Sequence, residues 1–234
     1  MEQAHDAAQG GVLGRGGHVM RSWLRGNRIA LLLLPVAVIT AVLASSSRIE
    51  DYWWAKGLHH AFRADSSGVA HFKDAYDDGY LTYPIAANIT LTSVEPVTTI
   101  DNSLGVPQPV TVPKGAMLWR VVLGFKADPD VVLWGCRIAI VDTNGTRYDA
   151  ESRQFHSFGA TPIRTCVPDD TPGPRPVIGS TAKPKVADGE SPRPRAYEAE
   201  TYVVTPKGVE PDNVRVWWVP PKYAELPVDE TSRG

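Results

Sequence analysis

One apolar run, Ile29 to Ala44, constrains this chain more than any other segment: it reads IALLLLPVAVITAVLA and contains no charged residue. Together with the small residues Ser45 to Ser47, it would span about 28 Å as a helix, close to the ~30 Å hydrocarbon core of a bilayer. A buried helix of a soluble protein is rarely apolar on every face. The sequence therefore predicts a transmembrane helix over residues 29–47, with the lipid bilayer as its partner.

Charges on the two flanks predict the orientation of this helix. Residues 1–28 contain four arginines and two acids, whereas the other flank balances Arg48 and Lys56 against Glu50 and Asp51. Because positive charge favours the cytoplasmic side, residues 1–28 are predicted to be a disordered cytoplasmic tail. The predicted location is the plasma membrane, in a single pass, with the C-terminal domain extracytoplasmic.

A cleaved signal peptide is the alternative interpretation of the run, with cleavage near Ala44 and release of a soluble secreted protein. Two observations favour a retained anchor. The 28 residues before the run are long for the basic region of a signal peptide. Trp23 and the aromatic cluster Tyr52-Trp53-Trp54 lie about thirty residues apart, roughly 45 Å along a helix, which suits aromatic belts at both membrane interfaces.

Composition argues against one class of partner and favours a turn-rich fold. The chain is 43% hydrophobic and 21% charged, and its formal net charge of −2 comes without a basic stripe interleaved with aromatics. Nucleic acid is therefore not an expected partner. Twenty glycines and twenty prolines among 234 residues favour many turns over long helices.

The two cysteines, Cys136 and Cys166, both follow the apolar run and belong to the predicted outer part. A pair of thiols outside the cytoplasm usually forms a disulfide, and closing this loop would contribute about 3 kcal/mol in the chain-entropy model. A two-cysteine metal or redox site is the alternative. The wide spacing, with no histidine at ligand distance in the sequence, disfavours it.

Period-two alternation of apolar and polar side chains predicts strands beyond residue 67. It is clearest over 85–94 and 116–126, and the run 132–142 shows the same pattern. The dipeptide Asn144-Gly145 follows and predicts a type I′ hairpin turn, which needs positive φ at both central positions. The returning strand is expected over 146–151.

Further strands are expected over 68–76, 196–206 and 213–221. Residues 167–195 hold seven prolines and predict a long surface loop or a partly disordered excursion. The predicted fold class is mainly β: an antiparallel immunoglobulin-like sandwich of about seven strands, preceded by the transmembrane helix. The predicted domains after the helix are a juxtamembrane linker (48–67), the sandwich (68–222) and a C-terminal tail (223–234).

Four segments carry a resemblance to a known class of domain: GAMLWRVVLGF, GCRIAIVDTNGTRYD, the cysteine in CVPDD, and TYVVTPKGVEPDNVRVWW. Following a membrane anchor or signal, they resemble the immunoglobulin-like extracytoplasmic domains of uncharacterised actinobacterial surface proteins, over residues 80–220. The resemblance implies an envelope or secreted β-sandwich with a binding or structural role. It brings no catalytic residue.

The sequence contains no pattern that points to catalysis, a metal or a cofactor. His59-His60 and His71 lack the converging ligands of a metal site. The acids of Asp74 to Asp78 and of Asp169-Asp170 lack the spacing of a calcium loop and are expected to be turn residues. Motifs of nucleophilic hydrolases, P-loops and dinucleotide-binding folds are absent from the sequence. An enzyme is not expected, and a metal-dependent or hydrolytic enzyme on a β-sandwich is kept as an alternative.

Three tryptophans, Trp119, Trp134 and Trp218, fall on apolar faces and are predicted to be core residues. Trp217 alternates to the face opposite Trp218. Beside Tyr223 it is the candidate for an exposed docking aromatic, because such residues anchor interfaces. The alternative is that both faces of this strand are covered. The predicted function is a non-catalytic binding or structural module of the cell envelope, with an envelope protein as its partner.

Overall fold

The computed structural model describes residues 23, 26–49, 54, 56–101, 106–150, 166–177 and 179–233. The chain forms two compact units, residues 1–55 and 56–234.

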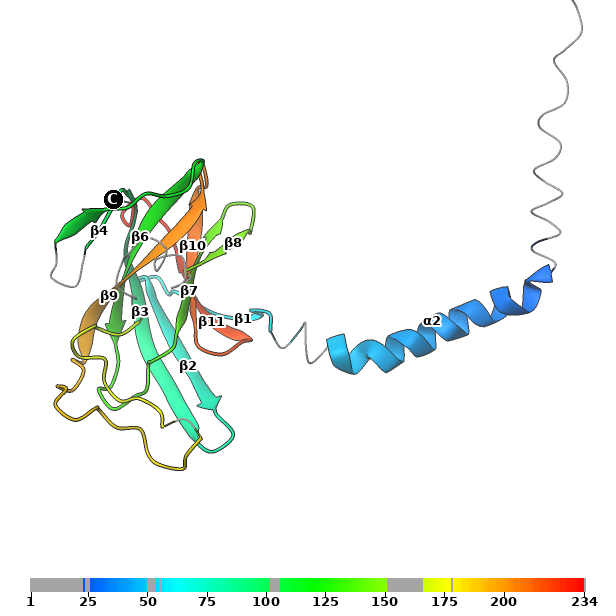
Figure 1. Cartoon of the computed structure of the whole chain (residues 1–234), viewed down its shortest axis with the longest axis horizontal. Coiled ribbons are helices and arrows are strands. Elements are labelled where there is room, and N and C mark those ends of the chain that lie inside the picture. Colours follow the sequence, from blue (N-terminus) through cyan, green and yellow to red (C-terminus); the bar gives the residue numbers. More distant parts are fainter. Residues whose placement is uncertain are drawn as a thin grey trace, which may run out of the picture. The chain divides into compact units, whose positions relative to one another are not determined.

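The first unit contains helix α2 (Arg28–Ile49), which covers the apolar run (Figure 1). Every side chain from Arg28 to Ser45 is exposed. The hydroxyl of Thr40 donates a hydrogen bond to the carbonyl oxygen of Val36, so this polar group is satisfied within the helix. By length and composition α2 can cross a membrane, as a signal sequence also can. The predicted N-terminal apolar helix is thus confirmed.

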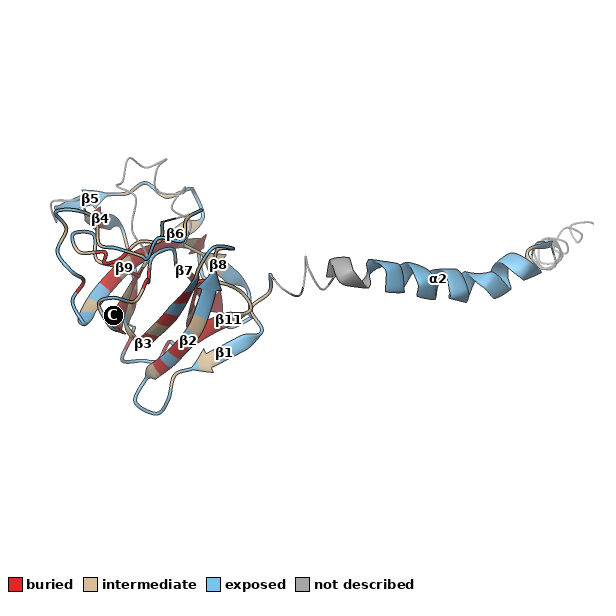
Figure 2. Cartoon of the chain, turned by 90° about the horizontal axis from the view of Figure 1, so that it is seen from below, coloured by how far each residue is buried: buried red, intermediate tan, exposed pale blue. Residues whose placement is uncertain are grey.

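The second unit is built of strands, which pair into two larger sheets and a ribbon. The five-stranded sheet has the order β1-β11-β10-β7-β8, the four-stranded sheet the order β2-β3-β6-β9, and β4 pairs with β5. Figure 2 shows buried residues along the strands of both larger sheets, which pack face to face. The prediction of a mainly β unit with two packed sheets is confirmed. The strands within the described residues are β1 (His60–Arg63), β2 (Val69–Asp77), β3 (Thr82–Val97), β4 (Thr99–Asp101), β5 (Pro107–Pro109), β6 (Ala116–Lys126), β7 (Arg137–Asp142), β8 (Arg147–Asp149), β9 (Ala196–Pro206), β10 (Pro211–Trp217) and β11 (Lys222–Pro227).

The described strands outnumber the seven expected and are not all antiparallel, because β1 pairs with β11 in parallel. β1 lies in the segment expected to be a linker. β11 lies in the expected tail, yet its Leu226 is fully buried. Both strands are short, and in each the charged or polar residues stand three apart, so no period-two alternation is visible. Neither sequence is therefore apolar over enough residues to predict a strand.

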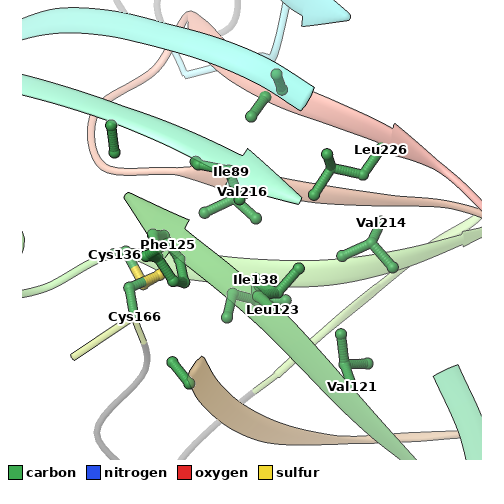
Figure 3. Close-up of a cluster of buried hydrophobic side chains, with 14 of the residues drawn as sticks. Ile89, Val121, Leu123, Phe125, Cys136, Ile138, Cys166, Val214, Val216 and Leu226 are labelled. Atoms are coloured by element: carbon green, nitrogen blue, oxygen red, sulfur yellow. A yellow bond between two sulfur atoms is a disulfide. The ribbon is translucent and has the colours of Figure 1, made fainter. Parts of the chain in front are cut away.

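The main core lies between the two larger sheets and follows the period-two pattern. Val121, Leu123 and Phe125 of β6 face inward, as do Ile138 and Ile140 of β7. The burial of these apolar side chains is the main force that holds the sheets together. Figure 3 shows part of this core with inward-facing residues of three other strands: Ile89, Val214, Val216 and Leu226.

The predicted hairpin at Asn144-Gly145 is present between β7 and β8. Gly145 has a φ of 80°, but φ of Asn144 is not positive, so the turn is not of the predicted type I′. Asp142 stabilises the turn instead, because its Oδ1 accepts hydrogen bonds from the amides of Asn144 (2.9 Å) and Thr146 (2.8 Å). The carboxylate of Asp142 thus fixes the turn, so that a positive φ at Asn144 is not needed.

Candidate binding surface at the loop end of the sandwich

Three connecting segments lie at one end of the sandwich, which we call the loop end. They are the β2–β3 turn (78–81), the β6–β7 connection (127–136) and the described part of residues 166–195. The end of β6 at Lys126 lies opposite the start of β9 at Ala196, and β3 begins beyond this point. Figure 1 shows the β2–β3 turn and the proline-rich segment at the same end of the sheets.

A disulfide between Cys136 and Cys166 ties two of these segments together, as predicted. Both cysteines are buried in the main core and lie beside Phe125 in Figure 3. Their bond restricts the unfolded chain, which stabilises the fold by about 3 kcal/mol for a loop of ~30 residues. While the bond is intact, neither sulfur atom is available as a nucleophile.

Arg193 holds the proline-rich segment against the sandwich. Its side chain is 1% exposed, and Nη2 donates hydrogen bonds to the carbonyl oxygens of Asp128 and Val131, each at 2.8 Å. The guanidinium lies 5.6 Å from the ring centre of Tyr197, whose hydroxyl donates to the carbonyl oxygen of Cys166 at 2.8 Å. Burial lowers the pKa of Arg193 and raises the pKa of Tyr197. The described part of this segment is therefore a loop that is attached to the domain, not an excursion from it.

Trp134 lies at the surface of the loop end and not in the core as predicted. β7 begins only at Arg137, because Gly135 adopts a φ of 81° and interrupts the alternation before it. The indole is 39% exposed, and the guanidinium of Arg175 lies 5.2 Å from its ring centre. Glu190 fixes that guanidinium through an ion pair at 2.5 Å. Trp134 is thus an oriented surface aromatic.

The β2–β3 turn and the end of β2 present tyrosines to solvent. Tyr80 is 60% and Tyr76 39% exposed, and Tyr76 stacks on Tyr83 with ring centres 6.2 Å apart. Asp78 shapes the turn through its Oδ1, which accepts hydrogen bonds from the amides of Leu81 (2.8 Å) and Tyr80 (2.9 Å), while its Oδ2 accepts one from the Tyr83 hydroxyl (3.0 Å). These hydrogen bonds lower the pKa of Asp78. The acid has the turn role expected of it.

Exposed large apolar side chains concentrate at the loop end. Among the described residues of the second unit, five such side chains are exposed, and only Val106 lies elsewhere, beside β5. Exposed aromatic residues are common anchors of interfaces. The loop end is therefore the candidate binding surface. Tyr80 carries a sequence signal, because it follows the turn dipeptide Asp78-Gly79, whereas Trp134 carries none. The four side chains at the loop end are Tyr76, Tyr80, Trp134 and Val177.

His71 of β2 is hydrogen-bonded to one neutral and one acidic neighbour. No group of three His, Cys, Asp or Glu residues in the described ranges has an arrangement that could hold an ion. His71 lies with Nδ1 2.8 Å from Oδ1 of Asn88 and Nε2 3.1 Å from Oδ2 of Asp65. The hydrogen bond with Asn88, and then that with Asp65, raise the pKa of His71.

Trp217, the predicted docking aromatic, is 2% exposed, so the fold does not present it to a partner. The predicted alternation is correct, because Trp218 faces the core, where its Nε1 donates to the carbonyl oxygen of Leu133 at 3.0 Å. Trp217 faces the other way but is covered. Leu58 packs on the cluster that contains its indole, and the guanidinium of Arg147 lies 5.3 Å from its ring centre.

No protein-family model, curated protein or solved structure matches the chain. The resemblance to immunoglobulin-like extracytoplasmic domains therefore rests on the strand pattern alone. The residues themselves establish a mainly β unit of two packed sheets, a disulfide and an N-terminal apolar helix. The helix and the disulfide together suggest an extracytoplasmic β protein.

Proposed function

We propose that this chain is a single-pass membrane protein whose sandwich lies outside the cytoplasm and binds a component of the cell envelope without catalysis. The observation that carries the proposal is α2, which exposes apolar side chains all round from Ile29 to Ala44. A bilayer accommodates such a surface, and water does not. The disulfide supports the outer location of the sandwich, because thiols are kept reduced in the cytoplasm.

Aromatic residues on both sides of α2 support its retention in the membrane. Trp23 and Trp54 are exposed and lie on either side of the apolar run. Tryptophan side chains prefer the interface between membrane and water, so this arrangement suits a helix that stays in the bilayer. The four arginines within residues 1–28 favour a cytoplasmic N-terminus.

The loop end supports the binding role. Arg175 lies over the ring of Trp134, and the ring of Tyr76 stacks on that of Tyr83. Aromatic side chains that are already held in place lose little conformational entropy when they bind a partner. An envelope component that packs against these rings is therefore the partner that the surface fits.

The full chain with a C-terminal epitope tag, produced in a bacterial host, tests the anchor. We expect it to stay in membranes washed with alkaline carbonate, with an intact mass that includes residues 1–28. Protease added to spheroplasts should remove the tag. The matched variant Ala44→Leu removes the small residue at the predicted cleavage site and should behave identically. A mature chain that begins at Ser45 in the soluble fraction would overturn the anchor and support the secreted protein.

The double variant Tyr80→Ala with Trp134→Ala tests the binding surface. The detergent-solubilised full chain serves as bait for envelope extracts, in parallel with wild type and Val106→Ala, which removes an exposed apolar side chain away from the loop end. We expect the double variant to lose at least one envelope component that the other two retain. Equal retention by all three proteins would show that the loop end is not the binding surface.

A further inference from the structure

The outer face of the five-stranded sheet carries four arginines, and we call it the arginine face. Residues next to them along their strands face the core, including Ile138, Val214 and Val216. Since side chains alternate along a strand, the arginines lie on the opposite face. They are Arg63 of β1, Arg137 of β7, Arg147 of β8 and Arg215 of β10.

Most of the acidic groups on this face are already engaged with its arginines. Glu225 pairs with Arg63 at 3.1 Å and with Arg215 at 3.3 Å. Asp149 pairs with Arg147 at 2.7 Å. A third carboxylate, Asp212, lies at the bulge that begins β10 and accepts a hydrogen bond from Asn213. The guanidinium groups therefore outnumber the carboxylates, in a chain whose formal net charge is −2.

Three of the four arginines are exposed, and Arg137 has no acidic partner among the described residues. The side chain of Arg63 is 79% exposed although it pairs with Glu225. Arg137 is exposed, and no ion pair joins it to any described residue. A guanidinium presents five N–H donors in a planar fork, so a group that uses one or two of them can still bind an oxyanion.

Aromatic rings underneath hold the other two guanidinium groups in place. Arg147 lies 5.3 Å from the ring centre of Trp217, and Arg215 lies 4.8 Å from that of Tyr223. Both rings are buried in one small cluster on this face, together with Ala139. Cation–π contact orients a guanidinium without neutralising it. The positive groups of this face are thus pre-ordered.

The linker from α2 reaches the sandwich on the same face. Leu58 packs against the cluster of Ala139, Trp217 and Tyr223 before the chain enters β1. Residues 50–57 connect Ile49, the end of α2, to this contact. A chain of eight residues spans at most about 30 Å when fully extended. The segment that follows α2 therefore meets the sandwich at the arginine face.

We propose that the arginine face binds the anionic headgroups of the bilayer that holds α2. The proposal rests on the retained anchor proposed above. Phosphate oxygens are the ligands that paired guanidinium N–H groups fit best, and basic surfaces near a transmembrane helix are attracted to anionic lipid. Because residues 50–57 keep the sandwich at a high effective concentration near the bilayer, a weak electrostatic attraction is enough for the arginine face to bind the headgroups. In the bound state the sandwich lies with its five-stranded sheet toward the membrane.

Chemical modification of arginine tests this proposal on the full chain, reconstituted into vesicles of phosphatidylcholine alone or with added phosphatidylglycerol. Peptide mass spectrometry then follows the rate at which phenylglyoxal modifies each arginine. In vesicles with phosphatidylglycerol we expect Arg63 and Arg137 to react about fivefold more slowly than in phosphatidylcholine alone, an effect that salt should abolish. Arg195 is the internal control, because its side chain is 75% exposed at the loop end.

A double variant and a carbonate wash separate the possible outcomes. Arg147 is exposed on the same face and should also react more slowly in wild type. Arg63→Gln with Arg137→Gln should remove this protection of Arg147, whereas the matched variant Arg195→Gln should leave it intact. If the chain stays in both kinds of vesicle after carbonate but Arg63 and Arg137 react at equal rates, the arginine face does not bind anionic lipid and the anchor stands. If carbonate extracts the chain, the anchor itself is wrong. If Arg63 and Arg137 are protected to the same degree in both kinds of vesicle, their protection does not depend on lipid charge, and the proposal is wrong.

Discussion

The outer faces of the two larger sheets solve the same packing problem in opposite ways. Each bears a small apolar cluster outside the main core. On the four-stranded sheet, Leu118 and Tyr202 are covered by a layer of chain, because Ile100 of the β4–β5 ribbon packs on them. On the five-stranded sheet, no ribbon among the described residues covers Trp217 and Tyr223, and arginine side chains lie over their rings. Arginine side chains, together with Leu58 of the linker, thus cover on this sheet what a ribbon covers on the other.

The charges on the two faces are arranged in inverse triads. On the four-stranded sheet, Arg120 lies between Glu95 at 2.5 Å and Glu200 at 3.7 Å. On the five-stranded sheet, Glu225 lies between Arg63 and Arg215, directly opposite both in the strand register. One face thus centres a cation between two acids and the other an acid between two cations. This inversion distinguishes the face proposed to meet anionic lipid.

Trp217→Ala should have the largest effect on stability. Replacing a fully buried tryptophan leaves a cavity and typically costs about 3–5 kcal/mol of unfolding free energy. Trp134→Ala is the matched control and should cost less than about 0.5 kcal/mol, because surface substitutions rarely cost more. Urea denaturation of the full chain in detergent, followed by circular dichroism, measures both. Similar costs for the two tryptophans would mean that the arginine layer does not bury Trp217.

Leu118→Ala should have the next largest effect, since Leu118 is fully buried under the β4–β5 ribbon. We expect a loss of about 2–3 kcal/mol, at the lower end for such substitutions because the cluster is small. Hydrogen exchange should show faster exchange in β4 and β5 than in β6. If exchange in the ribbon does not change, Leu118 is not what holds it to the sheet.

Glu225→Gln should cost less, about 1 kcal/mol, because the ion pairs that it removes are partly exposed. The two arginines would then repel each other across β11. Arg63→Gln is the matched control, and since its side chain is 79% exposed we expect almost no change. A double-mutant cycle over both positions isolates the pair. A coupling energy of zero would show that the ion pair between Arg63 and Glu225 does not stabilise the fold.

The alternation of apolar and polar residues predicted the strands that are long and half-buried. It could not predict the burial of residues that depends on contacts between distant parts of the chain. The pattern placed β3, β6 and β9 correctly and put Trp217 and Trp218 on opposite faces, but it extended β10 four residues too far, to 221. It could not show that Arg147, from another hairpin, covers Trp217. The arrangement of the loop end could not be predicted either, because the burial of Arg193 depends on two carbonyl groups more than sixty residues away.

Both sheets have a hairpin that is stabilised by an aspartate, and replacing this residue gives the smallest predicted effect on stability. In each sheet an aspartate closes a hairpin by accepting hydrogen bonds from two amides and one tyrosine hydroxyl. Asp78 does so with Tyr83, and Asp142 does so with Tyr148. Burial opposes ionisation of Asp142, but the hydrogen bonds prevail, and the pKa of both carboxyl groups is lowered.

A lowered folded-state pKa makes the stability of both hairpins depend on acid. Each carboxylate contributes stability above the unfolded pKa of about 3.9, and this contribution is lost as the pH falls through the folded pKa. Asp78→Asn and Asp142→Asn keep an oxygen acceptor for the amides but cannot ionise. We expect both variants to be less stable than wild type at pH 7, with a difference that shrinks as the pH falls below about 4. Denaturation at a series of pH values measures this. If the difference in unfolding free energy does not change with pH, the aspartates stabilise their hairpins through hydrogen-bond geometry and not through charge.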